Sequence, residues 1–526
     1  MKANKLIFIA TLTVLSACSK DFLELDPQGM QFEDNFYANK TEIYEGLLAA
    51  YDLTTQKFTG AYTYHSSYMM RNIASDDANC GGGNALDMID WQAMDEFSAT
   101  STNTALMAHW WRSYFGIYRC NQIIVRVDPH DFSLYEVPTD SIIIKKYIAE
   151  AKFLRAYFNY ELVTFFGGVP IVKEFVTAAD PYPTKSTAEE VWAFIEQDLE
   201  EAIPDLPRKS EQGPAELAHA SKGAAQALLG KAYLFQKKYD EAAIVLEDLI
   251  GTGDYMLDPE GYAHIFSAAG EFGPESIYEL SYTNTGPADW TANNTRAYDG
   301  NVDVQMMGVR ELSGASEYNP GWGFNKAEPS LVNAFLDEGD MIRMNVSIYS
   351  TDTLKAHEPA VTWNSDYKYT GWYCNKYAPK KDRETDGVGA KELDYNVNEI
   401  VFRYADVLLM AAEAHMFKST PNEGLTHGYI NEIRNRVGLG DIDAGLSGND
   451  LFLALVKERR LELAMEGQRY LDLIRWGLAP TVLVDQPQAE SNNYGSFVDG
   501  VNEYFPIPHQ EIDRSNGALE QNPAYL

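Results

Sequence analysis

Several residue types are scarce in this sequence of 526 residues. Only four cysteines are present, and no CxxC pair occurs, which excludes the common zinc and thiol-redox motifs. Basic residues are also few, because 42 Lys and Arg stand against 77 Asp and Glu, giving a formal charge of −35. A field of that sign repels nucleic acids and anionic lipid surfaces, so neither is an expected ligand.

Catalytic motifs are missing as well. The sequence contains no GxSxG, no HExxH and no P-loop, and its nine histidines are scattered without a plausible cysteine partner. Two carboxylates that lie close in sequence carry little information when 77 are available. We therefore expect a protein that is not an enzyme and that needs no cofactor or metal.

Long hydrophobic runs are absent outside the N-terminus. There, two lysines precede an apolar run from Leu6 to Leu15, which is too short for a permanent membrane span and predicts a signal peptide over residues 1–17. The sequence LSAC then matches a bacterial lipobox that ends at Cys18. We expect Cys18 to be diacylated and to anchor the chain to a membrane surface, with residues 18–40 as a tether. A plain secretory signal is the alternative.

The clearest internal pattern is a tetratricopeptide-like helix hairpin within 226–250. Leu229-Gly230 is followed by Tyr233, Ala242 and Leu246 at the spacing of that repeat. The small residues allow two helices to approach, and the larger ones fill the space between them.

Other segments repeat apolar residues at helical spacing and end at Gly or Pro. They predict helices over 41–56, 104–127, 144–166, 189–203, 403–417 and 428–439, and a last pair near 451–477. Helix pairs thus recur throughout, which predicts a mainly α, tetratricopeptide-like scaffold built from 41–254 and 401–526.

Two stretches interrupt the helical pattern. Residues 255–400 are rich in Gly, Asn, Asp and aromatics and contain four of the nine tryptophans. The second stretch is a polar, Gly-rich loop over 74–97. Because long interruptions of a helical array usually carry function, we expect 255–400 to form an irregular insert that faces a ligand.

The segment 458–477, ERRLELAMEGQRYLDLIRWG, is dense in opposite charges. Arg459 and Glu462, Arg469 and Asp472, and Asp472 and Arg475 are three apart and can pair along helical faces. We expect a partly buried ion network that fixes the terminal helices, with Gly467 at a kink or helix junction.

Five features in one order resemble the SusD/RagB family of outer-membrane nutrient-binding lipoproteins. They are the lipobox with DFLELDP, AEAKFLRAYFNYELVTFFGGVPIV (149–172), RYADVLLMAAEA with YINEIRNRVGL, the charged segment above, and the terminal YFPIPHQEID…QNPAY. The resemblance implies about four tetratricopeptide-like helix pairs and an irregular binding face. It also implies an oligosaccharide or peptide cargo, a surface-facing outer-membrane location, and a SusC-like TonB-dependent barrel as partner, over which the protein sits as a lid.

Candidate ligand contacts in the 74–97 loop are Asp77, Asn79 and Trp91. Aromatic rings can stack on the flat C–H faces of sugars, while carboxylates and amides bond their hydroxyls. Family members resemble this chain in carrying a polar, Gly-rich loop at that place. The alternative is a loop whose tryptophan packs on the scaffold. Calcium held by Asp76, Asp77 and Asp87 is a further alternative, although the spacing is not DxDxDG.

Candidate contacts in the insert are Trp290, Arg296, Tyr298, Trp322 and Trp372. The first three lie within ADWTANNTRAYDG, a mixture that suits recognition of hydroxyl groups. Trp322 lies in a GWG turn that is similar to one in the family and can equally be structural. Trp372 lies in an expected strand and can instead be packed there.

Three functions are consistent with these patterns. The leading one is a surface glycan-binding lipoprotein that delivers an oligosaccharide to its transporter without chemistry, or similarly delivers a peptide. The second is a glycoside hydrolase that uses two carboxylates of the insert. The third is a protein-only scaffold, although the aromatic insert argues against it.

Overall fold

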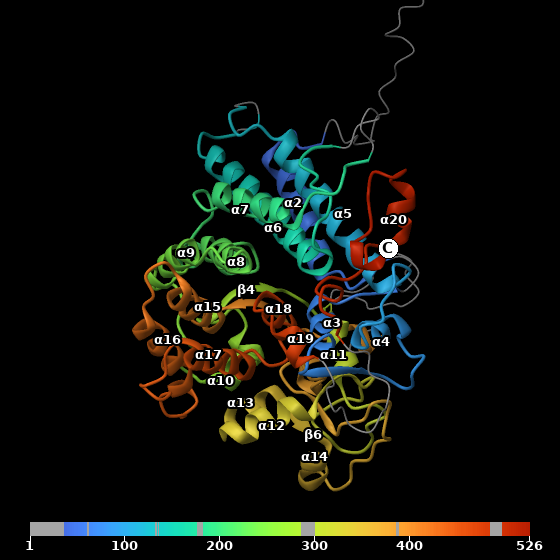
Figure 1. Cartoon of the computed structure of the whole chain (residues 1–526). Helices are drawn as coiled ribbons and strands as arrows, with labels where there is room; N and C mark the ends of the chain where they lie inside the picture. Colours follow the sequence, from blue (N-terminus) through green and yellow to red (C-terminus); the bar gives the residue numbers. More distant parts are fainter. Residues whose placement is uncertain are drawn as a thin grey trace, which may run out of the picture.

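The computed structural model describes residues 36–59, 63–131, 134, 136–175, 182–285, 300–384, 389–483 and 497–526. Helices dominate these residues, as predicted, and the strands are short. Figure 1 shows the helices in a stack, with the N-terminal helices at one end and α12 (Pro329–Glu338), α13 (Met341–Ser347) and α14 (Thr351–His357) at the opposite end.

The N-terminal half of the scaffold is a run of antiparallel helices whose ends follow local sequence signals. The side chain of Asn39 caps α2 by accepting from the backbone N–H of Glu42, and Thr187 forms a capping box with Glu190 on α7. Gly167, at φ +69°, ends α6 in a backbone conformation that favours glycine. The helices are α2 (Lys40–Thr55), α5 (Thr104–Arg126), α6 (Asp140–Phe166), α7 (Ala188–Ala202), α8 (Lys222–Phe235) and α9 (Tyr239–Gly251).

The predicted hairpin of 226–250 is formed by α8 and α9. A Cβ on Gly230 would lie 2.5 Å from Cδ2 of Leu246, so the close approach of the two helices requires glycine there. Both Ala242 and Leu246 are fully buried. The repeat signature in the sequence therefore describes the real packing of this helix pair.

The C-terminal half continues the same stack, because α15 packs on α9 as well as on α16 and α17. Its helices are α15 (Tyr404–Phe417), α16 (Glu423–Arg436), α17 (Gly448–Glu462), α18 (Arg469–Arg475), α19 (Ala479–Val482) and α20 (His509–Arg514). In Figure 1, α20 lies beside α5, so the end of the chain returns to the N-terminal helices.

The insert contains short helices and most of the strands. They are α10 (Tyr262–Ile265), β4 (Ser276–Leu280), α11 (Val302–Met307), β5 (Phe324–Ala327), α12 (Pro329–Glu338), α13 (Met341–Ser347), β6 (Ile348–Ser350), α14 (Thr351–His357), β7 (Trp372–Cys374) and β8 (Glu399–Arg403). An antiparallel pair joins β4 to β8. A four-stranded sheet has the order β3-β5-β7-β6, where β3 (Ala78–Gly81) comes from the early loop between α3 (Ser67–Ile73) and α4 (Ile89–Asp95).

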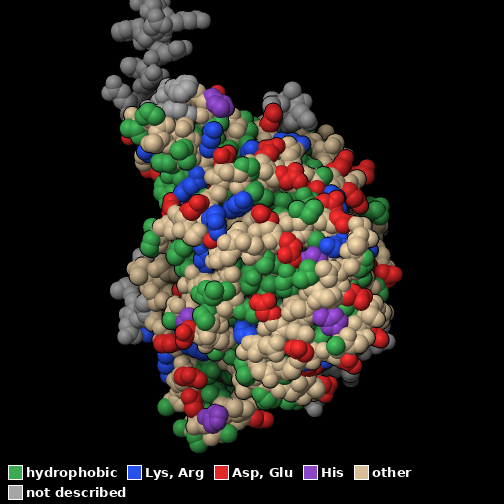
Figure 2. All heavy atoms as spheres, turned by 90° about the vertical axis from the view of Figure 1, so that its left-hand side faces the viewer, with side chains coloured by type: hydrophobic (Ala, Val, Ile, Leu, Met, Phe, Trp, Pro, Cys, Tyr) green, Lys and Arg blue, Asp and Glu red, His purple; other side chains and the backbone are tan. Residues whose placement is uncertain are grey.

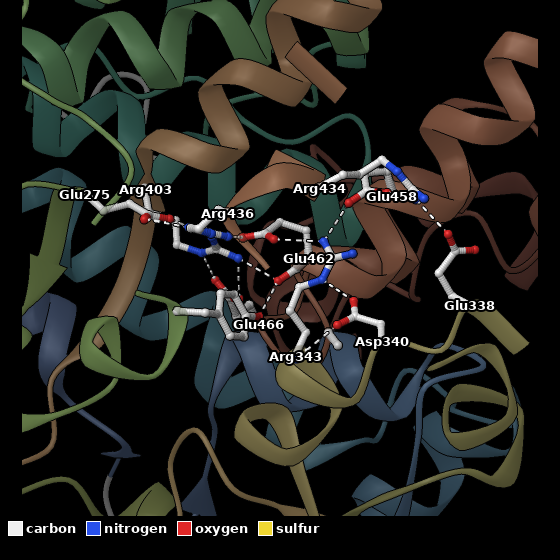
Figure 3. A network of polar contacts seen from close by, with 12 residues as sticks. Glu275, Glu338, Asp340, Arg343, Arg403, Arg434, Arg436, Glu458, Glu462 and Glu466 are labelled. Carbon is white, nitrogen blue, oxygen red and sulfur yellow. Dashed lines mark hydrogen bonds and ion pairs between the residues drawn. The ribbon is translucent and has the colours of Figure 1, made fainter. Parts of the chain in front are cut away.

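The charged segment 458–477 lies inside a buried ion network (Figure 3). The guanidinium of Arg403 bonds Glu275 at 2.9 Å, Glu466 at 2.8 Å and also Glu462. Arg343 reaches Glu458 at 2.6 Å. Burial alone would raise the pKa of Glu462, but Arg436, Arg403 and Arg343 hold that pKa well below its usual range.

The network matches the predicted role but not all of the predicted pairs. Asp472 and Arg475 form the expected pair at 2.8 Å. Arg459 instead bonds Asp406 on α15 at 2.9 Å and Asp472 at 2.8 Å, and Arg469 bonds Asp76 at 2.8 Å. Helical spacing could not reveal these partners, because they come from other elements. Gly467, at φ +72°, lies at the junction of α17 and α18, as expected.

The surface on the side of α9, α15 and α16 carries mixed charge. Figure 2 shows acidic side chains spread over this face and interspersed with basic and hydrophobic ones. Within the described ranges, every helix is too short or too polar to span a bilayer. Cys80, Cys120 and Cys374 are buried free thiols.

Candidate functional site

The Gly-rich loop and the insert are joined by strand pairing. Asn79 of β3 lies opposite Lys326 of β5, and Gly81 lies opposite Phe324. Gly81 and Gly82 have φ values of +74° and +87°, which lets the chain turn sharply away from β3. The two stretches that interrupt the helical scaffold therefore meet in one sheet.

Asp77, Asn79 and Trp91 lie inside this junction, each only 1% exposed. The carboxylate of Asp77 pairs with Arg460 at 2.7 Å, and the amide of Asn79 donates to Glu328 at 2.6 Å. The ring of Trp91 lies 5.3 Å from that of Tyr64. In this structure the three side chains are therefore not accessible to a ligand. Trp91 packs on the scaffold, which is the alternative given above for this loop.

The calcium alternative does not fit the same loop. Arg469 and Arg460 neutralise Asp76 at 2.8 and 2.9 Å, and Arg460 also holds Asp77. Asp87 accepts the backbone N–H of Gly83 at 2.7 Å and faces Arg310. Among the described residues, no group of three His, Cys, Asp or Glu is placed to hold a metal.

Trp322 and Trp372 are the described candidates that reach the surface. Both are partly buried, and each ring packs against the main core on one side. Trp322 lies just before β5, and its backbone N–H donates to the backbone carbonyl of Gln305 at 3.0 Å. Trp372 opens β7 opposite Ser350. Both residues are thus positioned by the scaffold while keeping part of the side chain accessible.

The remaining candidates lie outside the described residues. These are Trp290, Arg296 and Tyr298 of the insert, together with the lipobox cysteine, Cys18. Their assignments stay predictions.

Three segments, residues 82–90, 308–323 and 363–372, lie against one another and carry partly exposed side chains, and we call them together the loop face. The N–H of Gly82 donates to the carbonyl of Gly323 at 2.7 Å, and the carbonyl of Gly82 accepts from Tyr367 at 3.0 Å. Arg310 donates to the carbonyl of Trp322 at 3.2 Å and lies 3.6 Å from Asp87. The three segments thus meet around Arg310.

Sequence reasoning missed several side chains of the loop face. Arg310 is about one-third exposed, and Trp363, Tyr367 and Tyr369 are half-buried. The indole N–H of Trp363 donates to the hydroxyl of Tyr369 at 3.1 Å, which fixes both rings. Nothing in the sequence around Arg310 marks it, whereas the aromatic density of 363–373 was a usable signal.

Buried ion pairs support the loop face from below. Lys326 bonds Asp366 at 2.6 Å, and Lys368 bonds Asp95 at 2.7 Å, with all four side chains buried. Beside them, burial raises the pKa of Glu328 to about 7. These ion pairs join β5 to the segment 363–372, and that segment to α4, next to the partly exposed rings.

The loop face combines what recognition of a hydroxyl-rich ligand needs. Fixed aromatic rings offer apolar surface, and a guanidinium, carboxylates and amides offer oriented hydrogen bonds at the edge.

Comparison with known proteins places this chain in a class. The model of the SusD family matches residues 271–525, and a model described as starch-binding, associating with the outer membrane, matches residues 21–234. The chain belongs to the SusD family, as the resemblance in its sequence predicted. Association with the outer membrane is part of that family description.

Particular relatives resemble the chain over almost its whole length. A laminarin-binding SusD-like protein is 32% identical, with a TM-score of 0.80 over 93% of this chain and 100% of that one. Surface glycan-binding protein A from Bacteroides thetaiotaomicron, solved with laminarihexaose, is 27% identical with a TM-score of 0.80 over 92% of this chain and 99% of that one. SusD-like protein P2 from Formosa agariphila is 27% identical, with both chains fully covered.

Proposed function

We propose that this protein is a surface glycan-binding lipoprotein that captures an oligosaccharide on its loop face and delivers it to a SusC-like TonB-dependent transporter, acting as a lid. The observation that carries the proposal is the likeness to glycan-binding relatives over more than nine-tenths of the chain. The partly exposed Trp322 and Trp372 support it, because rigid rings are the natural platform for sugars. No chemical step is part of the proposal.

The leading ligand is a laminarin-type glucan. Two relatives with TM-scores of 0.80 are named for laminarin or contain laminarihexaose. A glucan of this kind is uncharged, so the formal charge of −35 does not repel it. Acylation at Cys18 would keep the protein at the cell surface, where it can contact a polysaccharide outside the cell. Trp290, Arg296 and Tyr298 remain proposed contacts.

The test is retardation of the purified protein in native gels that contain laminarin or other polysaccharides, with a reducing-end assay on the same samples. Retardation by laminarin without new reducing ends is the expected result. New reducing ends would favour the hydrolase alternative. Absence of retardation by any glycan, together with binding of peptides, would favour peptide cargo.

Variants connect this test to the loop face. Trp372→Ala should weaken binding by about 1–3 kcal/mol, the usual scale for loss of an aromatic contact. Trp372→Phe keeps a flat ring and should recover most of that loss. Equal binding by the wild type and both variants would remove Trp372 from the site.

A further inference from the structure

A second concave surface lies away from the loop face. It is a groove of about 1780 Å³ bounded by α2, α5, α20 and the segments around 170–175 and 182–183. It shares no lining residue with the loop face. Its volume exceeds the ~300–1,000 Å³ of sites for small ligands, so it suits an extended ligand.

One side of α5 supplies the floor of this groove. Trp111, Phe115, Tyr118, Gln122 and Arg126 follow one another at steps of three or four residues, so they lie along one face of the helix. The other faces of α5 are covered by α2 and α6. The groove is thus lined by a helix face that begins with exposed aromatic rings and ends with the buried amide of Gln122 and the partly buried guanidinium of Arg126.

The rings of the groove are unusually accessible. Phe115 is 57% exposed, Tyr118 39%, and Tyr182 on the opposite wall 43%. Tyr118 contacts Phe175 edge to face, with centroids 6.4 Å apart. A contiguous apolar patch, unlike a single exposed ring, often marks the binding site of a ligand or a partner.

Gln122 gives an independent indication of a ligand. Its side chain is buried, and its Oε1 accepts from Nε of Arg126 at 2.7 Å, which fixes the orientation of the amide because arginine can only donate. The Nε2 of Gln122 is left buried without a hydrogen-bond partner. Buried donors are rarely unpaired, so an acceptor from a bound molecule would complete this position.

We propose that this groove is a second glycan-binding surface, which takes the same class of neutral oligosaccharide as the loop face. The proposal rests on the proposed function of the protein. Sugar hydroxyls would accept from Nε2 of Gln122 and from Arg126, while Phe115, Tyr118 and Tyr182 provide flat surfaces for the rings.

The lining chemistry favours a glycan over a polypeptide. A peptide usually adds to a strand edge or places an amphipathic helix on a continuous apolar floor. The described lining residues lie in helices and coil, and Glu45, Asp52 and Arg119 interrupt the apolar surface. Four acidic and three basic side chains nearly balance, which suits an uncharged ligand; they are Glu45, Asp52, Glu174, Glu511, Arg119, Arg126 and Arg514.

The experiment is a calorimetric titration with laminarihexaose, repeated with whichever glycan gives the strongest gel retardation. The wild type should bind two molecules per chain. A groove variant, Phe115→Ala with Tyr118→Ala, should weaken only one of the two sites, and the loop-face variant Trp372→Ala should weaken only the other. The variant with all three changes should show weakened binding at both sites. Gln122→Leu should weaken only the groove site, by about tenfold or more.

Controls make each result decisive. Ile244→Ala removes a 72% exposed side chain from α9 and should leave both sites intact, and unchanged thermal unfolding shows that each variant is folded. One site in the wild type, with unaltered binding by the groove variant, would overturn this inference and leave the proposed function standing. No glycan binding by the wild type would overturn both. Loss of peptide binding alone in the groove variant would assign the groove to a polypeptide.

Discussion

The ion network around α17 and the loop face are both rich in polar and charged side chains, yet they differ in what remains accessible. Arg403, Glu458 and Glu462 are each at most 1% exposed, and they form their ion pairs with other buried side chains of the network. On the loop face, Arg310 and the rings of Trp322 and Trp372 keep part of their surface open. Dense charge is therefore found in the scaffold of this protein, whereas fixed side chains that stay partly exposed are found on the proposed binding surface.

The difference has a physical reason. A buried charge must be paired and hydrogen-bonded, so the segment that supplies many such charges is committed to internal contacts. A surface that binds a ligand needs side chains that are fixed by contacts with the protein but still have hydrogen-bonding groups or apolar area free for the ligand. The two regions should consequently respond to substitution in different measurements: unfolding for the network and binding for the loop face.

The largest effect is expected from Arg403→Met. Removing this guanidinium leaves Glu275, Glu462 and Glu466 buried with one cation fewer, which should lower the free energy of unfolding by about 3–5 kcal/mol. Urea denaturation followed by circular dichroism measures it. Unchanged stability would mean that the network does not hold the scaffold and would remove the contrast between the regions.

A smaller and pH-dependent effect is expected from Glu328→Gln, beneath the loop face. The pKa of Glu328 in the folded protein, about 7, lies above its ordinary value of 4.5, so the folded state binds more protons between these pH values. The stability of the wild type should fall as the pH rises through this window, whereas the variant lacks this loss. At pH 8 the variant should be more stable by an amount on the order of 3 kcal/mol.

Thermal unfolding of both proteins from pH 4 to pH 8 tests this expectation. The difference in stability should grow with pH and level off above pH 7. A constant difference across the range would show that Glu328 does not titrate there. The amide of Asn79 can still donate to the Oε1 of a glutamine, so loss of that hydrogen bond is not expected to confuse the result.

Arg310→Ala should change binding more than folding. This side chain is partly exposed and its pairing with Asp87 is long, at 3.6 Å, so stability should change little. A charge-assisted hydrogen bond to a sugar hydroxyl is worth about 1.5–3 kcal/mol, and affinity for the glycan should fall by that amount. Calorimetry and denaturation of the same preparation give both values. A large loss of stability with normal affinity would reverse the assignment.

The smallest effect is expected from Lys457→Ala, at the exposed edge of the ion network. Its side chain is 51% exposed and pairs with Glu338. Such surface pairs contribute about 0–1 kcal/mol, so the midpoint of urea denaturation should shift slightly at most. The difference between the losses of unfolding free energy in Lys457→Ala and Arg403→Met then compares an exposed cation of this network with a buried one.

The helical scaffold could be predicted from the sequence because its signals are local. Caps, glycines and the 3.6-residue period fix α6, α7 and the α8–α9 pair, and each of these can be recognised within about 30 residues. The buried role of 458–477 was also predictable, because its charges alternate with large apolar residues.

The candidate site was harder to predict because its contacts are distant in sequence. In the sequence, Asp77 resembles a ligand contact. In the folded protein it pairs with Arg460, which lies 383 positions later in the chain. Asn79 is likewise taken up by Glu328, 249 positions later. Composition could mark the region of Trp322 and Trp372, but only the assembled sheet decides which rings remain partly open.

The pairing of β3 with β5 also has a consequence for how the molecule is made. Loop closure over roughly 245 residues costs conformational entropy before any contact repays it, and such non-local pairings form slowly. The helix pairs can form from neighbouring segments, whereas the sheet beneath the loop face must wait for most of the chain, and Arg460 of α17 joins it later still. The proposed binding surface is therefore expected to form late in folding. A truncated chain that lacks β5 or Arg460 could still form the early helix pairs but could not assemble the loop face.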